Sequence, residues 1–156
     1  MAVHNITWNA TSSGVGSTEA IEVALKWLTG GQAEITKEKV KSYHGARMTL
    51  LRAHIGQKKA SKQSICHLGS DLLNQLSQSA DLSQRIDGGN VLHIRLDISS
   101  LVSGSIELSS GSGEQVKGRI KLEAYPGQDP IENAREMLSA AAKKADSEGF
   151  PIDFHS

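Results

Sequence analysis

The chain has little of what small domains use to cross-link themselves or to build metal sites. Cys66 is the single cysteine in 156 residues, so no internal disulfide can form, and the paired ligand spacing of a zinc site is missing. A lone thiol fits a reducing compartment, and we expect a cytoplasmic protein. Aromatic residues make up only 4% of the chain, so the core must be mainly aliphatic.

The sequence also lacks an excess charge of one sign and long apolar runs. Its 17 basic and 17 acidic side chains cancel, so any basic surface that attracts nucleic acid has to be local. The segment 1–8 has no basic start followed by an apolar run, which argues against a signal peptide. No stretch approaches the roughly 18 apolar residues of a membrane span, so we expect no membrane partner.

Hydrophobic periodicity predicts one α+β domain at residues 1–149 and a C-terminal tail at 150–156, docked by Phe150 or Phe154. Strands are expected at 3–10, 33–43, 47–55, 91–97, 105–109 and 116–125, the last two as a hairpin, and helices at 17–28, 60–77 and 130–148. The order β-α-β-β-α-β-β-β-α, with one apolar face per strand, favours a two-layer sandwich. Its mainly antiparallel sheet carries helices on one face.

Alternation along the strands leaves the other face of the sheet polar and open. Its predicted members share an outward position and a basic, amide or hydroxyl side chain: Asn5, Thr7, Asn9, Arg52, His54, His93, Arg95, Arg119 and Lys121. Lys58 and Lys59 follow the strand that carries Arg52. His4 is expected on the apolar side, with Ile6 and Trp8. Such side chains can contact RNA phosphates and sugars, although exposed strand faces are polar in any protein.

Aromatic side chains that could stack on bases are missing from this predicted face. Only Tyr43 and Tyr125 are available, both near strand ends. Because RNA readers that select bases commonly stack them on such rings, the pattern favours contacts to the RNA backbone and to its shape.

No group of residues has the arrangement of an active site. The glycine-rich turn before residue 19 lacks both the third glycine of a dinucleotide fingerprint and a Walker lysine, so we interpret it as a connector. The histidines are scattered, and the neighbours Cys66 and His67 project about 100° apart on a helix, which makes them poor joint ligands. We therefore expect no enzymatic activity, no cofactor and no metal.

Short motifs along most of the chain resemble an archaeal family of small proteins. They are His4–Trp8, Tyr43–Gly45, Thr49–Ala53, Ile94–Asp97 and Ile120–Pro126, in the same order as in that family. The family is described as RNA-binding and as a predicted exosome-associated component, with a fold related to ribosomal protein L-five. The resemblance implies an α+β sandwich, an archaeal cytosolic setting, RNA and exosome subunits as partners, and no enzyme activity.

The chain departs from that family at two places. Residues 12–16 intervene where members carry an acidic stretch directly after the first strand, and Ala46-Arg47 stands where members usually have Asn-Pro. The second departure places the positive charge of Arg47 beside the Tyr43–Gly45 turn, which suits an RNA contact. The predicted RNA-binding set is therefore Arg47, Arg52, His54, Lys58, Lys59, His93, Arg95, Arg119 and Lys121.

Two other functions stay open from the sequence. The same open face, with Met48 and Leu50 at its edge, could pack on a protein partner or on a second copy as a homodimer. A deep cavity lined by His54, His93 and Asp97 would instead favour an enzyme.

Overall fold

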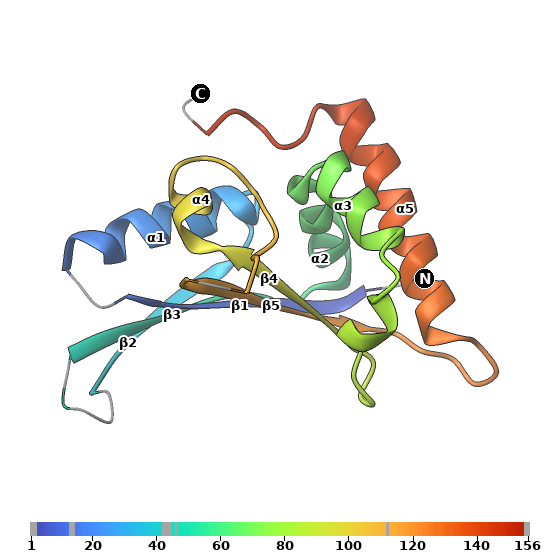
Figure 1. Ribbon diagram of the computed structural model, residues 1–156, viewed down its shortest axis with the longest axis horizontal. Helices are drawn as coiled ribbons and strands as arrows, with labels where there is room; N and C mark the ends of the chain where they lie inside the picture. The colour runs from blue at the N-terminus through green and yellow to red at the C-terminus, as the bar shows by residue number, and fades with distance from the viewer. Residues whose placement is uncertain (1–2, 13–14, 42–44, 46, 112, 155–156) are drawn as a thin grey trace.

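An antiparallel sheet carries all the helices on one of its faces in the computed structural model, which describes residues 3–12, 15–41, 45, 47–111 and 113–154 (Figure 1). The 5-stranded sheet has the order β2-β3-β1-β5-β4. Its strands are β1 (Val3–Ser12), β2 (Glu34–Lys41), β3 (Arg47–Ile55), β4 (Val91–Asp97) and β5 (Gln115–Leu122). The predicted two-layer α+β sandwich is confirmed. The Tyr43–His44 turn and Ser13-Gly14 of the glycine-rich turn lie outside the described residues.

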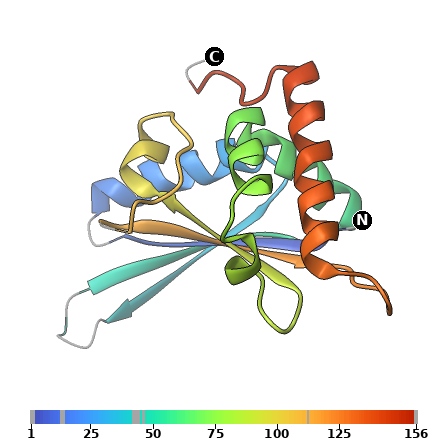
Figure 2. The same ribbon diagram turned by 45° about the vertical axis from the view of Figure 1, so that its right-hand side comes forward.

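The helical layer is divided into two groups that lie side by side on the sheet (Figures 1 and 2). One group contains α1 (Val15–Leu28) and α4 (Ile98–Val102). The other contains α2 (Lys58–Ile65), α3 (Ser70–Ser77) and α5 (Pro130–Glu148), with the short 3-10 turns η1 (Cys66–Leu68) and η2 (Leu82–Arg85). No helix among the described residues is long and apolar enough to cross a membrane.

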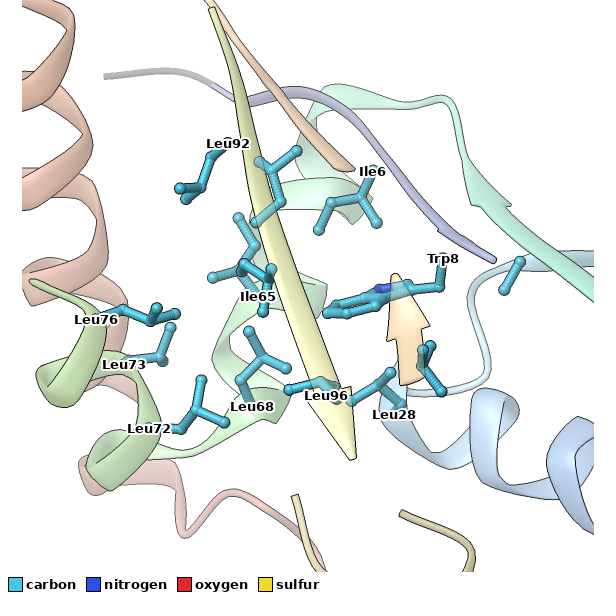
Figure 3. Close-up of a cluster of buried hydrophobic side chains, with 14 of the residues drawn as sticks. Ile6, Trp8, Leu28, Ile65, Leu68, Leu72, Leu73, Leu76, Leu92 and Leu96 are labelled. Atoms are coloured by element: carbon cyan, nitrogen blue, oxygen red, sulfur yellow. The ribbon is translucent and has the colours of Figure 1, made fainter. Parts of the chain in front are cut away.

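The core lies between the sheet and these helices, and it follows the predicted alternation (Figure 3). On β4, Leu92, Ile94 and Leu96 are completely buried, and the residues between them are not. Burial of one face only makes a period of two residues, which is why the strands could be recognised locally. The predicted apolar stripes of α1 (Ile21, Ala24, Leu25 and Leu28) and of the α2–α3 region (Ile65, Leu68, Leu72, Leu73 and Leu76) are all buried.

The last helix begins and ends where its sequence signals place it. The Asp129 carboxylate accepts a hydrogen bond from the backbone N–H of Ile131 at 3.0 Å, and Pro130 takes the first helical position. Gly149 ends α5 with a φ of 74°, the left-handed conformation that glycine adopts without a steric penalty.

The predicted helix at 60–77 is wrong in one respect, because it is two helices separated by η1 and Gly69. Gly69 has a φ of 89° and a ψ of 153°, which no helix accommodates. A Cβ there would lie 2.7 Å from Cδ of Pro151 in the C-terminal tail, so the tail requires the glycine.

The predicted strand at 105–109 and its hairpin with 116–125 are also wrong. This segment contributes a single bridge, Leu108 to Leu96, and β5 pairs with β1 and β4 instead. The preceding helix α4 was not predicted. It begins at Asp97, whose carboxylate accepts from the Ser100 backbone N–H at 2.9 Å.

The C-terminal tail docks on the helical layer through both of its phenylalanines, whereas the sequence predicted docking by Phe150 or Phe154. Phe150 packs on His67, with ring centroids 4.2 Å apart, and Phe154 meets Trp27 edge-on at 5.0 Å. The Trp27 indole N–H also donates to the carbonyl of Ile152 at 2.8 Å. The tail therefore connects the two helical groups (Figure 1).

Candidate nucleic-acid interface

The face of the sheet opposite the helices is formed by alternate residues of all the strands, and we call it the open face. The register assigns to it Glu34, Thr36, Glu38 and Val40 of β2, Met48, Leu50, Arg52 and His54 of β3, Asn5, Thr7, Asn9 and Thr11 of β1, Gln115, Lys117, Arg119 and Lys121 of β5, and Val91, His93, Arg95 and Asp97 of β4. None of these residues is Phe, Tyr or Trp.

Like charges stand directly opposite one another in the middle of the open face. Arg95 of β4 is the register partner of Lys117 of β5, and the next pair on this face sets Arg119 against His93, which is bound to Asp87. Within the described residues, Arg52, Arg95, Lys117 and Arg119 have no carboxylate at ion-pair distance. Because directly opposed like charges destabilise a strand pair, this arrangement is not one that folding favours.

The acidic residues of the open face lie at its margins. Glu34 and Glu38 belong to the edge strand β2. Asp97 is the last residue of β4. Its carboxylate accepts hydrogen bonds from the Ser100 backbone N–H at 2.9 Å and from the Ser100 hydroxyl at 2.7 Å. These hydrogen bonds lower the pKa of Asp97 and hold it as the cap of α4. The centre of the face is therefore basic.

The open face is hollowed along β1. One depression, with a volume of about 540 Å³, is lined by His4, Asn5, Thr7, Asn9, Arg52, His54, Val91, Arg119 and Lys121. A second, of about 470 Å³, is lined by Asn9, Ala10, Thr11, Thr36, Glu38, Leu50, Leu51, Arg52, Gln115 and Lys117. Because Asn9 and Arg52 line both, the two depressions are neighbours along β1, and we call them together the trough.

Hydrogen bonds fix the two histidines of the open face. The Nδ1 atom of His54 lies 2.8 Å from the Thr7 hydroxyl, and the Nε2 atom of His93 lies 2.8 Å from a carboxylate oxygen of Asp87. Asp87 also accepts from the backbone N–H groups of Gly89 and Val91. Hydrogen bonding to His93 and to this backbone lowers the pKa of Asp87 to about 2.

The loop between η2 and β4 projects on the helix-free side of the sheet (Figures 1 and 2). It lies next to the trough, because Val91 at its end is a lining residue. Lys121 donates to the carbonyl of Gly89 in this loop, and Asp87 binds His93 from the same loop. Lys121 and His93 of the open face therefore both bind this loop.

A β-bulge brings His4 to the rim of the trough, contrary to the expectation that it would face the core. Val3 pairs with Leu122 and Asn5 pairs with Lys121, so His4 is an extra residue in β1. His4 lies 3.9 Å from Glu123, which also forms an ion pair with Lys58. The hydrogen bond from Lys58 to the Glu123 carboxylate lowers the pKa of Glu123 and raises the pKa of Lys58.

The structure brings most of the predicted RNA-binding residues together. Arg52, His54, His93, Arg95, Arg119 and Lys121 share the open face. Lys58 reaches the rim through Glu123, and Lys59 is exposed on the first turn of α2. Arg47 is separate, because it pairs with Lys41 and has the same strand parity as the buried Leu51, which places it on the helix side of the sheet.

Sequence reasoning left two basic members of this surface out of the predicted set. Lys117 lies among the cations of β5, and the alternation of that strand pointed it outward although the predicted set did not include it. His4 depended on the bulge, for which the sequence carries no signal. Residues His54, His93 and Asp97 do not line a common cavity, since His93 binds Asp87 and Asp97 caps α4. No cluster of described residues has the ligands for a metal ion.

Comparison with known proteins identifies the family of the chain. The sequence profile of a protein family described as RNA binding matches residues 6–124. No protein with a curated description matches the chain.

Similar solved structures come from archaea. A DUF54 protein from Methanothermobacter thermautotrophicus is 26% identical, with 88% of this chain and 99% of that chain covered and a TM-score of 0.71. A DUF54 protein from Archaeoglobus fulgidus is also 26% identical, with 86% and 99% covered and a TM-score of 0.66. A third, from Sulfolobus solfataricus, is 12% identical with a TM-score of 0.63 over 87% of this chain and 98% of that chain, and it shows the fold alone. Since the profile runs from within β1 to just past β5 and covers most of the chain, the chain belongs to this family described as RNA binding.

Proposed function

We propose that the protein binds RNA on its open face, through the RNA backbone, and catalyses no reaction. The observation that carries this proposal is the register of β4 and β5, which sets Arg95 directly against Lys117, beside Arg119. Cations that stand directly opposite one another destabilise a strand pair. A polyanion that lies across both strands removes that repulsion and releases its own counterions.

The residues that we propose for the contact follow from their places on this face. Arg52, Arg95, Lys117, Arg119 and Lys121 would hold phosphates, with His54 and His93 beside them. Lys58 and Lys59 would extend the contact past the rim. Arg47 is left out because it lies on the other face of the sheet.

The partner complex is a further part of the proposal. The resemblance of the strand motifs to the archaeal family favours a cytoplasmic protein that works with the exosome or with ribosomal RNA. Affinity purification of the tagged protein before and after RNase treatment checks this. Exosome subunits that remain after RNase support direct association, and their complete absence from both samples contradicts it.

A charge reversal at Lys117 tests RNA binding on this face. In Lys117→Glu, the new carboxylate stands opposite Arg95, so the protein should become more stable while its RNA affinity falls. We expect a loss of about tenfold, the equivalent of the ~1.4 kcal/mol at the lower end for a hydrogen bond to a charged group. The dependence of log K on log salt should also become shallower by about one.

The matched control is Lys39→Glu. Lys39 is exposed on β2, at a position that faces the helix side of the sheet. Its substitution changes the net charge by the same amount as Lys117→Glu. Fluorescence anisotropy with labelled transfer RNA at several salt concentrations measures both variants. An equal loss of RNA affinity in Lys117→Glu and Lys39→Glu would show that only net charge matters. That result would contradict binding at the open face.

A further inference from the structure

The floor of the trough is a row of uncharged polar side chains on the central strand. Asn5, Thr7, Asn9 and Thr11 occupy every second position of β1. With about 3.4 Å per residue, the row extends over roughly 20 Å. In the part of the chain that the structure describes, Asn5, Asn9 and Thr11 have no side-chain hydrogen-bond partner, so their amide and hydroxyl groups are available to a ligand.

The sheet register sets the middle of this row between basic side chains of the two flanking strands. Asn9 pairs with Arg52 of β3 on one side and with Lys117 of β5 on the other. Thr7 pairs in the same way with His54 and Arg119. Two strand spacings of about 4.8 Å put the flanking backbones roughly 10 Å apart, so uncharged donors and acceptors lie in the middle and positive charge lies on both sides.

This order of groups complements the minor groove of an A-form duplex. That groove is wide and shallow and displays 2′-hydroxyls, and a phosphate backbone runs along each of its edges. A 2′-hydroxyl both donates and accepts hydrogen bonds, as do the amide of asparagine and the hydroxyl of threonine. Single-stranded RNA, in contrast, is commonly held by aromatic rings that stack on its bases. The aromatic residue of this sheet, Trp8, is only 2% exposed and faces the helices.

We propose that the ligand of the open face is base-paired RNA, with the β1 row contacting 2′-hydroxyls, Arg52 of β3 holding phosphates on one side and the cations of β5 holding them on the other. This inference rests on the proposed function, because it names the class of RNA that the same face binds. It also assigns a selective role to residues that carry no charge. Asn9 and Thr11 distinguish RNA from DNA, whereas Arg52 and Lys117 attract both.

The test uses three labelled probes of one sequence, namely a 20-base-pair RNA duplex, the corresponding DNA duplex and the unpaired RNA strand. We expect the wild type to bind the RNA duplex about tenfold more tightly than the other two in fluorescence anisotropy. The variant Asn9→Ala/Thr11→Val should lose about tenfold in affinity for the RNA duplex and keep its affinity for the DNA duplex. Arg52→Ala should weaken binding of all three probes.

The matched control is Asn74→Ala, which removes an exposed amide on α3 at the other side of the molecule and should change none of the affinities. Circular dichroism confirms that each variant is folded. Tighter binding of the unpaired strand, or equal loss of RNA and DNA binding in Asn9→Ala/Thr11→Val, would overturn the inference and leave the proposed function intact. Failure of the wild type to bind either RNA probe at low salt would overturn both.

Discussion

Gly118 is the position at which the smallest side-chain change should disturb the core most clearly. It lies in the middle of β5, with Trp8 of β1 as its register partner on one side and Ile94 of β4 on the other. The Trp8 ring covers it. A Cβ added to Gly118 would meet three ring atoms, with Cε3 at 2.6 Å and Cη2 at 2.8 Å.

The cost of Gly118→Ala can be worked from this contact. Carbon atoms attract best at separations of about 3.5–4.0 Å, so the ring has to move by roughly 1 Å within a filled core. Overpacking of this kind costs about 1–3 kcal/mol. Because alanine has less conformational entropy than glycine in the unfolded chain, the substitution also stabilises the folded state by about 0.4–1 kcal/mol. We therefore expect the free energy of unfolding to fall by about 1–2 kcal/mol and Tm to fall by roughly 2–8 °C.

Urea unfolding followed by circular dichroism measures this change, and Gly88→Ala is the control. Gly88 lies in the loop before β4, where a Cβ would meet nothing within 4 Å and the backbone conformation suits alanine. Gly88→Ala should leave stability unchanged or raise it slightly. If Gly118→Ala were as stable as Gly88→Ala, the Trp8 ring could not lie over Gly118. RNA affinity should stay at the wild-type level in both variants, since Gly118 lies on the helix side.

Two further predictions concern the helical layer. Burial lowers the pKa of His67 below its ordinary value of 6.5, so the unfolded chain binds a proton that the folded chain excludes, and the free energy of unfolding should fall as pH decreases through 6.5. Urea titrations between pH 7.5 and 5.5 check this, and an unchanged pH dependence in His67→Gln would contradict it. Asp129→Ala should cost about 1 kcal/mol, because it removes the cap of α5. Asp146→Ala, which removes a carboxylate from the C-terminal end of α5, should cost nothing in the same assay.

The strands and their faces could be predicted because each strand contains the necessary information in its own sequence. In β4, the alternation of Leu92, Ile94 and Leu96 with polar residues reflects burial of one face alone. Alternation also assigned Lys117 to the outer face. Alternation along β3 would have assigned Arg47 to the inner face, with Thr49 and Leu51. Arg47 was instead included in the RNA-binding set because it follows the Tyr43–Gly45 motif. For the open face, strand parity was therefore a better guide than proximity to a motif.

Other features depended on contacts between distant parts of the chain. The apolar stripe of the predicted helix at 60–77 continues across Gly69, so periodicity cannot detect the end of one helix and the start of the next. The glycine at this point is required by the close approach of Pro151 in the C-terminal tail. Ile106 and Leu108 alternate because they are half-buried against the core, and only Leu108 pairs with a strand. The bulge at His4 similarly follows from the register of β1 on β5.

A chain with zero net charge can carry a basic face because its acidic groups are committed elsewhere. Glu22 accepts from Lys37 at 3.0 Å, and this hydrogen bond lowers the pKa of Glu22. Asp81 lies 3.5 Å from Arg85. Such pairs neutralise cations away from the trough, and within the described part of the chain Arg95, Lys117 and Arg119 have no carboxylate at ion-pair distance. Screening limits their field to about 8 Å at physiological salt, so an RNA phosphate in the trough senses these local cations and not the sum over the molecule.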